Sequence, residues 1–209
     1  ANSTNIMARN TGPKNRIARR EGENLGLKSG INQKLERRLK VLPGQHGRMG
    51  KKKTSEYGVQ LREKQKVKAI YGVLETQFRK YFKIASKTHG ATGETLLSLL
   101  ERRLDNVVYR LKFASTRASA RQLVNHGHVS VNGKKNTIPS YLIKVNEVIS
   151  LDATALSMPD VKKQLSDTTP MITKWLEKKA AVGRVTRMPM RDDIEMSIND
   201  QLIVEFYSR

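Results

Sequence analysis

Two carboxylates at helical spacing are the first residues in this sequence whose types could support a reaction. Glu101 and Asp105 lie four positions apart, so on a helix they would project one turn from each other, as the paired acids of glycosidases and nucleases can. Basic residues at positions 102 and 103 lie between them. Opposite charges at this spacing ordinarily form surface ion pairs, so we interpret the two acids as ion-pair partners and not as a catalytic centre.

Histidine is the other residue type here that could bind a metal or move a proton. The histidines are His46, His89, His126 and His128, and the last two flank Gly127, where a helix is expected to end. A zinc site needs further ligands, no third ligand is evident beside this pair, and the sequence contains no cysteine. We therefore expect no metal and no cofactor, and we assign the pair to contacts with carbonyl groups or phosphate at a helix end.

The short motifs that mark common catalytic sites are absent from the sequence. It contains no GxxxxGK[ST] phosphate-binding loop, no HExxH zinc motif and no nucleophile elbow. The sequence accordingly predicts a protein that is not an enzyme.

A large excess of basic residues gives the first positive indication of function. There are 40 Lys and Arg against 19 Asp and Glu, a formal net charge of +21. Such self-repulsion destabilises a compact fold unless a polyanion neutralises it, and nucleic acid is the commonest one because phosphate contacts release condensed counterions. Charge alone is also compatible with heparin or an anionic membrane surface. No apolar run approaches the ~20 residues that span a bilayer, so we expect a soluble, cytoplasmic protein with no membrane partner, in which residues 1–6 form a short extension before Met7.

The first half of the sequence predicts basic helices joined by loops. Residues 9–53 are rich in Arg, Lys and Gly, with a short helix expected over 33–40, a turn at 42–47 and a basic run at 48–53. Good helix formers fill residues 56–70, and apolar residues at helical spacing follow over 74–85. These patterns indicate a mainly helical N-terminal domain.

A compact helix-helix-hairpin module is predicted next. An apolar stripe runs from Leu96 to Leu111, and a second helix capped by Ser115 or Thr116 ends near His126. The Asn132-Gly133 pair is typical of a type I′ turn between two strands, and a third strand is expected over residues 148–151.

The C-terminal part is expected to return to the N-terminal half. A short helix is expected from Asp160, Trp175 is expected to anchor a loop, and alternation over residues 202–207 predicts a strand paired with residues 184–187. The fold class is therefore α+β: a mainly helical N-terminal domain (1–94) completed by a C-terminal tail (175–209), with an inserted module (95–160) and a connection (161–174).

Several segments together resemble one protein family. They are ERRLDNVVYR (101–110), TRASARQLVNHG (116–127), VNG (131–133), PGQHG (43–47), YGVQLREKQK (57–66) and LIVEFYSR (202–209). In this order they resemble the small-subunit ribosomal protein S four family.

The resemblance implies a structural constituent of the small ribosomal subunit, located on the ribosome. Such proteins bind a junction in the 5′ domain of small-subunit rRNA, nucleate assembly, contact small-subunit protein S five, influence decoding accuracy and help line the channel by which mRNA enters. The alternative is an RNA-modifying enzyme or another RNA-binding factor that shares the module. For an enzyme, the rest of the chain is too short and irregular to form a catalytic domain. Many relatives hold zinc with a C-x-x-C pair, and the matching positions here are Asn15 and Ala18, so no zinc is expected.

The expected RNA contacts are mainly with phosphates and helix shape, because double-helical RNA hides its base edges in a deep groove. Arg117 and Arg121 are the strongest candidates, since they share the expected outward face of the second module helix. The full set of candidate RNA-binding residues is Arg9, Lys14, Arg16, Arg19, Arg20, Arg48, Lys51, Lys52, Lys53, Arg62, Lys64, Lys66, Arg102, Arg110, Arg117, Arg121, Gln122, His126 and Lys134.

Overall fold

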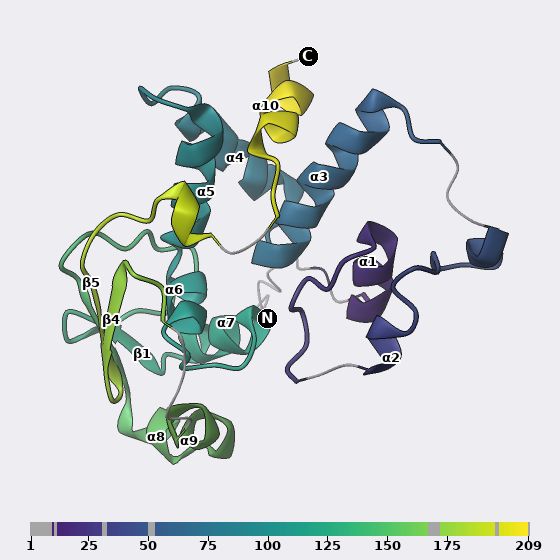
Figure 1. The fold of residues 1–209 in the computed structure, drawn as a ribbon. Coiled ribbons are helices and arrows are strands. Elements are labelled where there is room, and N and C mark those ends of the chain that lie inside the picture. The colour runs from purple at the N-terminus through teal and green to yellow at the C-terminus, as the bar shows by residue number, and fades with distance from the viewer. Residues whose placement is uncertain are drawn as a thin grey trace, which may run out of the picture.

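The computed structural model describes residues 10, 12–30, 33–49, 53–166, 172–194 and 197–208. A helical N-terminal body lies beside a smaller module that contains the sheet (Figure 1). Each has its own buried apolar cluster, one around Phe78 and Leu96 and one around Leu104 and Ile149. The expected α+β class is confirmed.

Six α-helices and one 3-10 turn make up the described part of the N-terminal body. They are α1 (Lys14–Glu21), α2 (Gln33–Glu36), the 3-10 turn η1 (Gly47–Met49), α3 (Glu56–Tyr71), α4 (Glu75–Ala85), α5 (Thr92–Glu101) and α10 (Asp200–Ser208). Helix α3 begins where the Ser55 hydroxyl accepts a hydrogen bond from the Gly58 amide, and it ends at Gly72, whose φ of 62° needs a residue without Cβ. The helices expected at 56–70 and 74–85 are confirmed, and that expected at 33–40 is shorter.

The module combines two helices with an antiparallel sheet. Its elements are α6 (Leu104–Arg110), α7 (Arg117–Asn125), β1 (Val129–Val131), β2 (Lys134–Lys135), β3 (Val148–Leu151), α8 (Ala153–Ser157), α9 (Pro159–Ser166), β4 (Leu176–Lys179), β5 (Val182–Val185) and the 3-10 turn η2 (Arg191–Asp193) that leads out of it. The strand order is β2-β1-β3-β5-β4. Thr116 caps α7, and Asn132 and Gly133 both have positive φ, as the expected type I′ turn requires.

The apolar stripe from Leu96 to Leu111 is divided between two helices, α5 and α6. At the break, Leu104 N donates to Tyr141 O and Ile143 N donates to Arg102 O, both at 2.9 Å. These bonds to the 141–143 loop replace helical ones, so α5 packs in the cluster around Phe78 and α6 packs in the cluster around Ile149.

The C-terminal strand predicted over residues 202–207 is wrong, because this segment is helix α10. Apolar residues occur there at both the even and the odd positions, so the same sequence also fits a helix. In the helix, Ile203 is fully buried in the N-terminal core. Its predicted partner strand pairs instead with β3 and β4. The 175–209 tail is thus shared: Trp175 and Val185 anchor in the module, and Ile203 in the N-terminal body.

The short helix expected from Asp160 is confirmed as α9. Within the described ranges, no helix has both the length and the apolar character needed to cross a bilayer.

Candidate nucleic-acid interface

A basic cleft of about 500 Å³ lies where α1, the C-terminal end of α3 and α7 come together. Figure 1 shows the end of α3 between the other two helices, so the cleft joins the N-terminal body to the module. The cations that line it are Lys14, Arg16, Arg20, Arg62, Lys68, Arg117 and Arg121. Six of these were expected from the sequence; the seventh, Lys68, was not.

Helix α1 supplies the most accessible cations of the cleft. It packs through Ala18, which is buried in the N-terminal core, so Arg16 and Arg20 are left exposed. Arg19 lies on another side and donates to the carbonyls of Val41 and Leu42, both at 3.0 Å. Arg19 therefore holds the loop after α2 and is not directed into the cleft.

Helix α3 contributes cations that already have acidic neighbours. Arg62 lies 3.4 Å from Glu21 and keeps 48% of its side chain exposed, while Lys68 bonds to Glu75 at 2.7 Å. Burial raises the pKa of Glu21 even though the Arg62 charge opposes that shift. Lys68 could have been found from sequence, because it follows Arg62 and Gln65 at steps of three along one helix face.

Helix α7 meets the cleft with arginines that are only partly accessible, which corrects the expectation of a fully outward face. The Arg121 side chain is 20% exposed and lies 3.4 Å from Asp105, which is itself held by Arg103 at 2.6 Å. Arg117 donates through Nε to Asn106 at 2.7 Å. The inward face of α7, with Ala120, Leu123 and Val124, is buried as expected.

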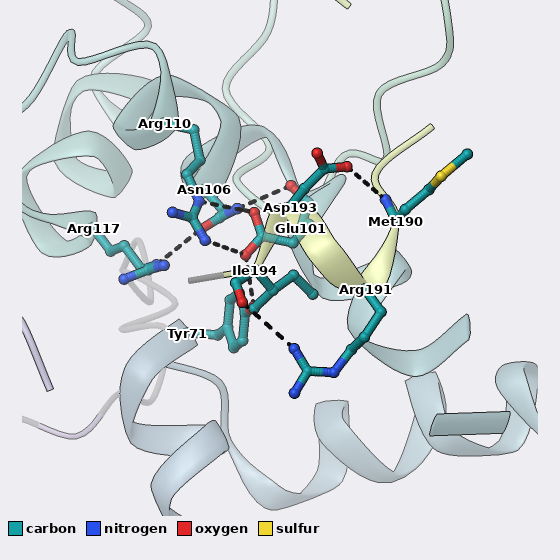
Figure 2. Close-up of polar contacts among 9 residues, drawn as sticks. All are labelled: Tyr71, Glu101, Asn106, Arg110, Arg117, Met190, Arg191, Asp193 and Ile194. Carbon is teal, nitrogen blue, oxygen red and sulfur yellow. Dashed lines mark hydrogen bonds and ion pairs between the residues drawn. The ribbon is translucent and has the colours of Figure 1, made fainter. Parts of the chain in front are cut away.

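Arg117 belongs to a buried polar cluster that we name the Glu101 junction, formed by Tyr71, Glu101, Asn106, Arg110 and Arg117 (Figure 2). One Glu101 oxygen accepts from the Tyr71 hydroxyl at 2.7 Å and from Arg110 at 2.9 Å. The other accepts from Asn106 at 2.7 Å and from Arg110 Nε at 3.0 Å. The Arg117 guanidinium lies over the rings of Tyr71 and Tyr109, 5.1 and 4.5 Å from their centroids.

The carboxylate at the centre of the junction is surrounded by donors that favour its ionised form. Burial opposes ionisation of Glu101, but the charge and hydrogen bonds of Arg110 outweigh it and hold the pKa of Glu101 below its ordinary value. Burial and the Glu101 charge raise the pKa of Tyr71, so its hydroxyl remains a donor. Glu101 thus forms an ion pair with Arg110, and Asp105 forms one with Arg103. Both pairs are buried, which corrects the expectation of surface pairs.

Other predicted cations are used inside the fold. Lys64 lies 3.2 Å from Glu75 and 4.1 Å from the Phe206 ring centroid, and Lys66 lies 2.8 Å from Glu23. Arg110 is committed to Glu101, and Arg102 Nε donates to Ile143 O at 3.0 Å. These positions disfavour RNA contact by Lys64, Lys66 and Arg110, because each is buried beside a carboxylate.

The remaining predicted residues lie elsewhere. Gln122, His126 and Lys134 are exposed at the outer side of α7 and on the β1–β2 hairpin, and Lys53 is exposed before α3. Arg9, Lys51, Lys52 and the side chain of Arg48 lie outside the described residues, as does the extension at 1–6. The cleft therefore gathers one part of the predicted set, and the hairpin side presents another.

The described residues contain no group of three or more His, Cys, Asp or Glu that could hold a metal ion. At the two positions that match a zinc-binding pair in relatives, Ala18 is packed in the N-terminal core and Asn15 is half-buried. A methyl group cannot ligate zinc, so apolar packing holds this segment.

Comparison with known proteins gives matches along nearly the whole chain. The family model "Ribosomal protein S4/S9 N-terminal domain" matches residues 9–101, and the "S4 domain" model matches residues 102–149. The boundary between them coincides with the break between α5 and α6. Among similar proteins, "Small ribosomal subunit protein uS4" of Herpetosiphon aurantiacus is 54% identical over 97% of this chain and 100% of its own length. The proteins of that name from Caldicellulosiruptor bescii and Geotalea daltonii are 53% and 51% identical over the same shares.

Proposed function

This chain belongs to the uS4 family of small ribosomal subunit proteins, and from that premise we propose that its basic cleft is the principal contact with small-subunit rRNA. The protein is a structural, non-enzymatic constituent of the small subunit. The observation that carries the proposal is the convergence of cations from α1, α3 and α7 on one cleft. Such a cleft can follow an RNA backbone, whose phosphates are neutralised with release of counterions.

Accessibility decides which cations serve as phosphate ligands. Arg16, Arg20 and Arg62 are exposed, while Lys14 and Arg121 are half-buried at the rim. The exposed Gln122, His126 and Lys134 form a second contact on the module. Recognition by phosphate and shape fits this arrangement, since few aromatic side chains are available to stack on bases.

The test is a salt titration of rRNA binding by the Arg16→Ala/Arg20→Ala variant. Each lost phosphate contact reduces the magnitude of the slope of log K against log salt by about 0.7–0.9. The double variant is therefore expected to show a slope that is flatter by ~1.5 units. The matched control is Lys162→Ala/Lys163→Ala, which removes two exposed cations from α9, away from the cleft. An unchanged slope in a folded Arg16→Ala/Arg20→Ala variant would place the RNA elsewhere.

We further propose that the protein binds the 5′ domain of small-subunit rRNA directly and early, and so nucleates subunit assembly. Support comes from the family resemblance together with a cleft that is already formed in the isolated chain. Filter binding should show preference for 5′-domain rRNA over a random structured RNA of equal length. Equal affinity for the two RNAs would remove the assembly role.

A contact with small-subunit protein S five, and through it an effect on decoding accuracy, completes the proposal. The exposed Tyr57 and Val59 at the start of α3 supply an apolar surface for a protein neighbour, with the Phe206 ring 5.5 Å from that of Tyr57. Replacing Tyr57 by Ser is expected to weaken co-sedimentation with S five while rRNA binding is retained. The basic run at 48–53 is assigned to the mRNA channel on the resemblance alone.

A further inference from the structure

The Glu101 junction spans the boundary between the N-terminal body and the module. Tyr71 is the last residue of α3 and Glu101 is the last residue of α5, whereas Asn106 and Arg110 lie on α6 and Arg117 opens α7. Figure 2 shows the side chains from both sides directed toward the Glu101 carboxylate. Glu101 is 1% exposed and Asn106 2% exposed, so RNA cannot touch the centre of the junction.

The junction is nevertheless continuous with the cleft wall. Tyr71 and Arg117 line the cleft and also belong to the junction. The Arg117 guanidinium is held by Asn106 at one edge and by two tyrosine rings, so its place depends on where α6 and the end of α3 lie. Neighbouring Arg121 is tied to α6 through Asp105. The position of Arg117 in the cleft is thus set by contacts that lead back to Glu101, while Arg121 is held by Asp105 on the same helix α6.

We propose that the Glu101 junction is a positioning device for RNA binding: it fixes α7 relative to α1 and α3, so that affinity for RNA depends on residues that RNA does not contact. The inference rests on the proposed function of the cleft. It follows that bound RNA stabilises the closed junction in return, because coupling between two sites is reciprocal. A cleft already held at its binding geometry loses less conformational freedom when RNA binds.

The charges in the junction explain why it is sensitive to a single change. Glu101 supplies the negative charge that compensates Arg110 directly and Arg117 through Asn106. Without that charge, Arg110 on α6 and Arg117 on α7 lose the carboxylate of the N-terminal body that attracts them, and the module side of the cleft can move away from the body. Glu101 therefore determines the width of the cleft and not only the stability of the fold.

The experiment compares two junction variants with a matched tyrosine variant. Tyr71→Phe removes one donor to Glu101 and keeps the ring under Arg117; Glu101→Gln removes the charge and keeps the size. Tyr141→Phe also removes a hydroxyl bonded to a glutamate, Glu147, and neither of these residues belongs to the junction or lines the cleft. Binding to 5′-domain rRNA is measured over a range of salt concentrations, with circular dichroism to confirm folding.

Both junction variants are expected to weaken binding by roughly 2- to 30-fold at every salt concentration, the range typical of residues that act on a site through others. The slope against salt should stay unchanged, because no phosphate contact is lost. Tyr141→Phe should bind as the wild type does. RNA should also slow amide exchange in α6 and α7 of the wild type more than in Glu101→Gln.

Wild-type affinity in folded Tyr71→Phe and Glu101→Gln would overturn the inference, as would a reduced salt slope in either, since that marks a direct contact. If Glu101→Gln fails to fold, the milder Tyr71→Phe decides between these outcomes. The proposal that the cleft binds rRNA is tested separately: an unchanged salt dependence of rRNA binding in Arg16→Ala/Arg20→Ala would contradict it.

Discussion

The Tyr207 hydroxyl donates a 2.7 Å hydrogen bond to Glu75 and so joins the last helix, α10, to the start of α4. Glu75 also receives Lys68 at 2.7 Å and Lys64 at 3.2 Å. Burial opposes ionisation of this carboxylate, but the hydrogen bonds from Lys68, Tyr207 and Lys64 lower its pKa to about 2. Three elements, α3, α4 and α10, thus converge on one charge.

Acid should weaken the fold in a window set by Glu75. Its pKa lies at about 2 in the folded protein against 4.5 ordinarily, so its stabilising contribution is complete above pH 4.5 and is lost as pH falls towards 2. Solvent screening makes the contribution modest, because the side chain is 37% exposed. Urea unfolding at several pH values should show a weaker acid dependence for Glu75→Gln than for the wild type. Parallel curves would mean that the carboxylate is not paired.

Replacing Arg117 by Ala should destabilise the protein, although the sequence placed this side chain on an outward face. The change removes the hydrogen bond to the buried Asn106 carbonyl oxygen and the contacts with two tyrosine rings. A buried acceptor left unpaired costs about 1–3 kcal/mol. Denaturant unfolding measures the loss, with the exposed Arg16→Ala as a control within about 0.5 kcal/mol of the wild type. An identical midpoint for Arg117→Ala would argue that the guanidinium is solvated.

The elements predicted correctly from sequence are those with strong local signals. Thr116 caps α7 through its own side chain, and Asn132-Gly133 fixes a two-residue turn, so neither depends on distant contacts. The C-terminal segment lacks such a signal. Its apolar residues satisfy both the strand and the helix period, and only packing of Ile203 against the N-terminal core selects the helix.

The sequence identifies candidate RNA-binding residues by their charge, but it does not show which of them are paired inside the fold and which are exposed. Lys66 is paired with Glu23 and Lys64 contacts the Phe206 ring, partners that lie far away in the sequence. Arg16 and Arg20 have the same residue type and remain exposed. Tertiary contact separates the two groups, and for that reason the cleft, with Lys68 in its wall, emerges only from the fold.

Gly183→Ala should disturb the packing of β5 against Leu111, the residue that follows α6. A Cβ at this position would lie 2.4 Å from Leu111 Cδ1, in a core where Leu111 is fully buried. Overpacking of this kind typically costs about 1–3 kcal/mol. Thermal unfolding of Gly183→Ala should show a lower midpoint than that of the wild type. The control is Gly133→Ala, whose Cβ meets no atom within 4 Å, so that this variant tests only the strain of a positive φ. A wild-type midpoint for Gly183→Ala would show that β5 and Leu111 can move apart at no cost in stability.

Ile203→Ala should destabilise the N-terminal body while sparing the module. Ile203 is fully buried among residues of that core, and truncating such a side chain costs about 2–5 kcal/mol. Amide exchange should accelerate in α3 and α4 and remain unchanged in β1 and β3. The exposed Gln201→Ala, on the same helix, is the control. Unchanged protection in α3 and α4 would separate α10 from this core.

The burial of Ile203 in the cluster that also holds Leu96 and Phe78 has a consequence for the order of events during synthesis. As the chain leaves the ribosome that makes it, α3, α4 and α5 emerge first, but the residue that closes their core is translated only after the entire module. The module can fold while the N-terminal body still exposes an apolar surface. Closing so long a loop is slow, and this newborn protein is therefore most vulnerable to aggregation and proteolysis just before its last helix appears.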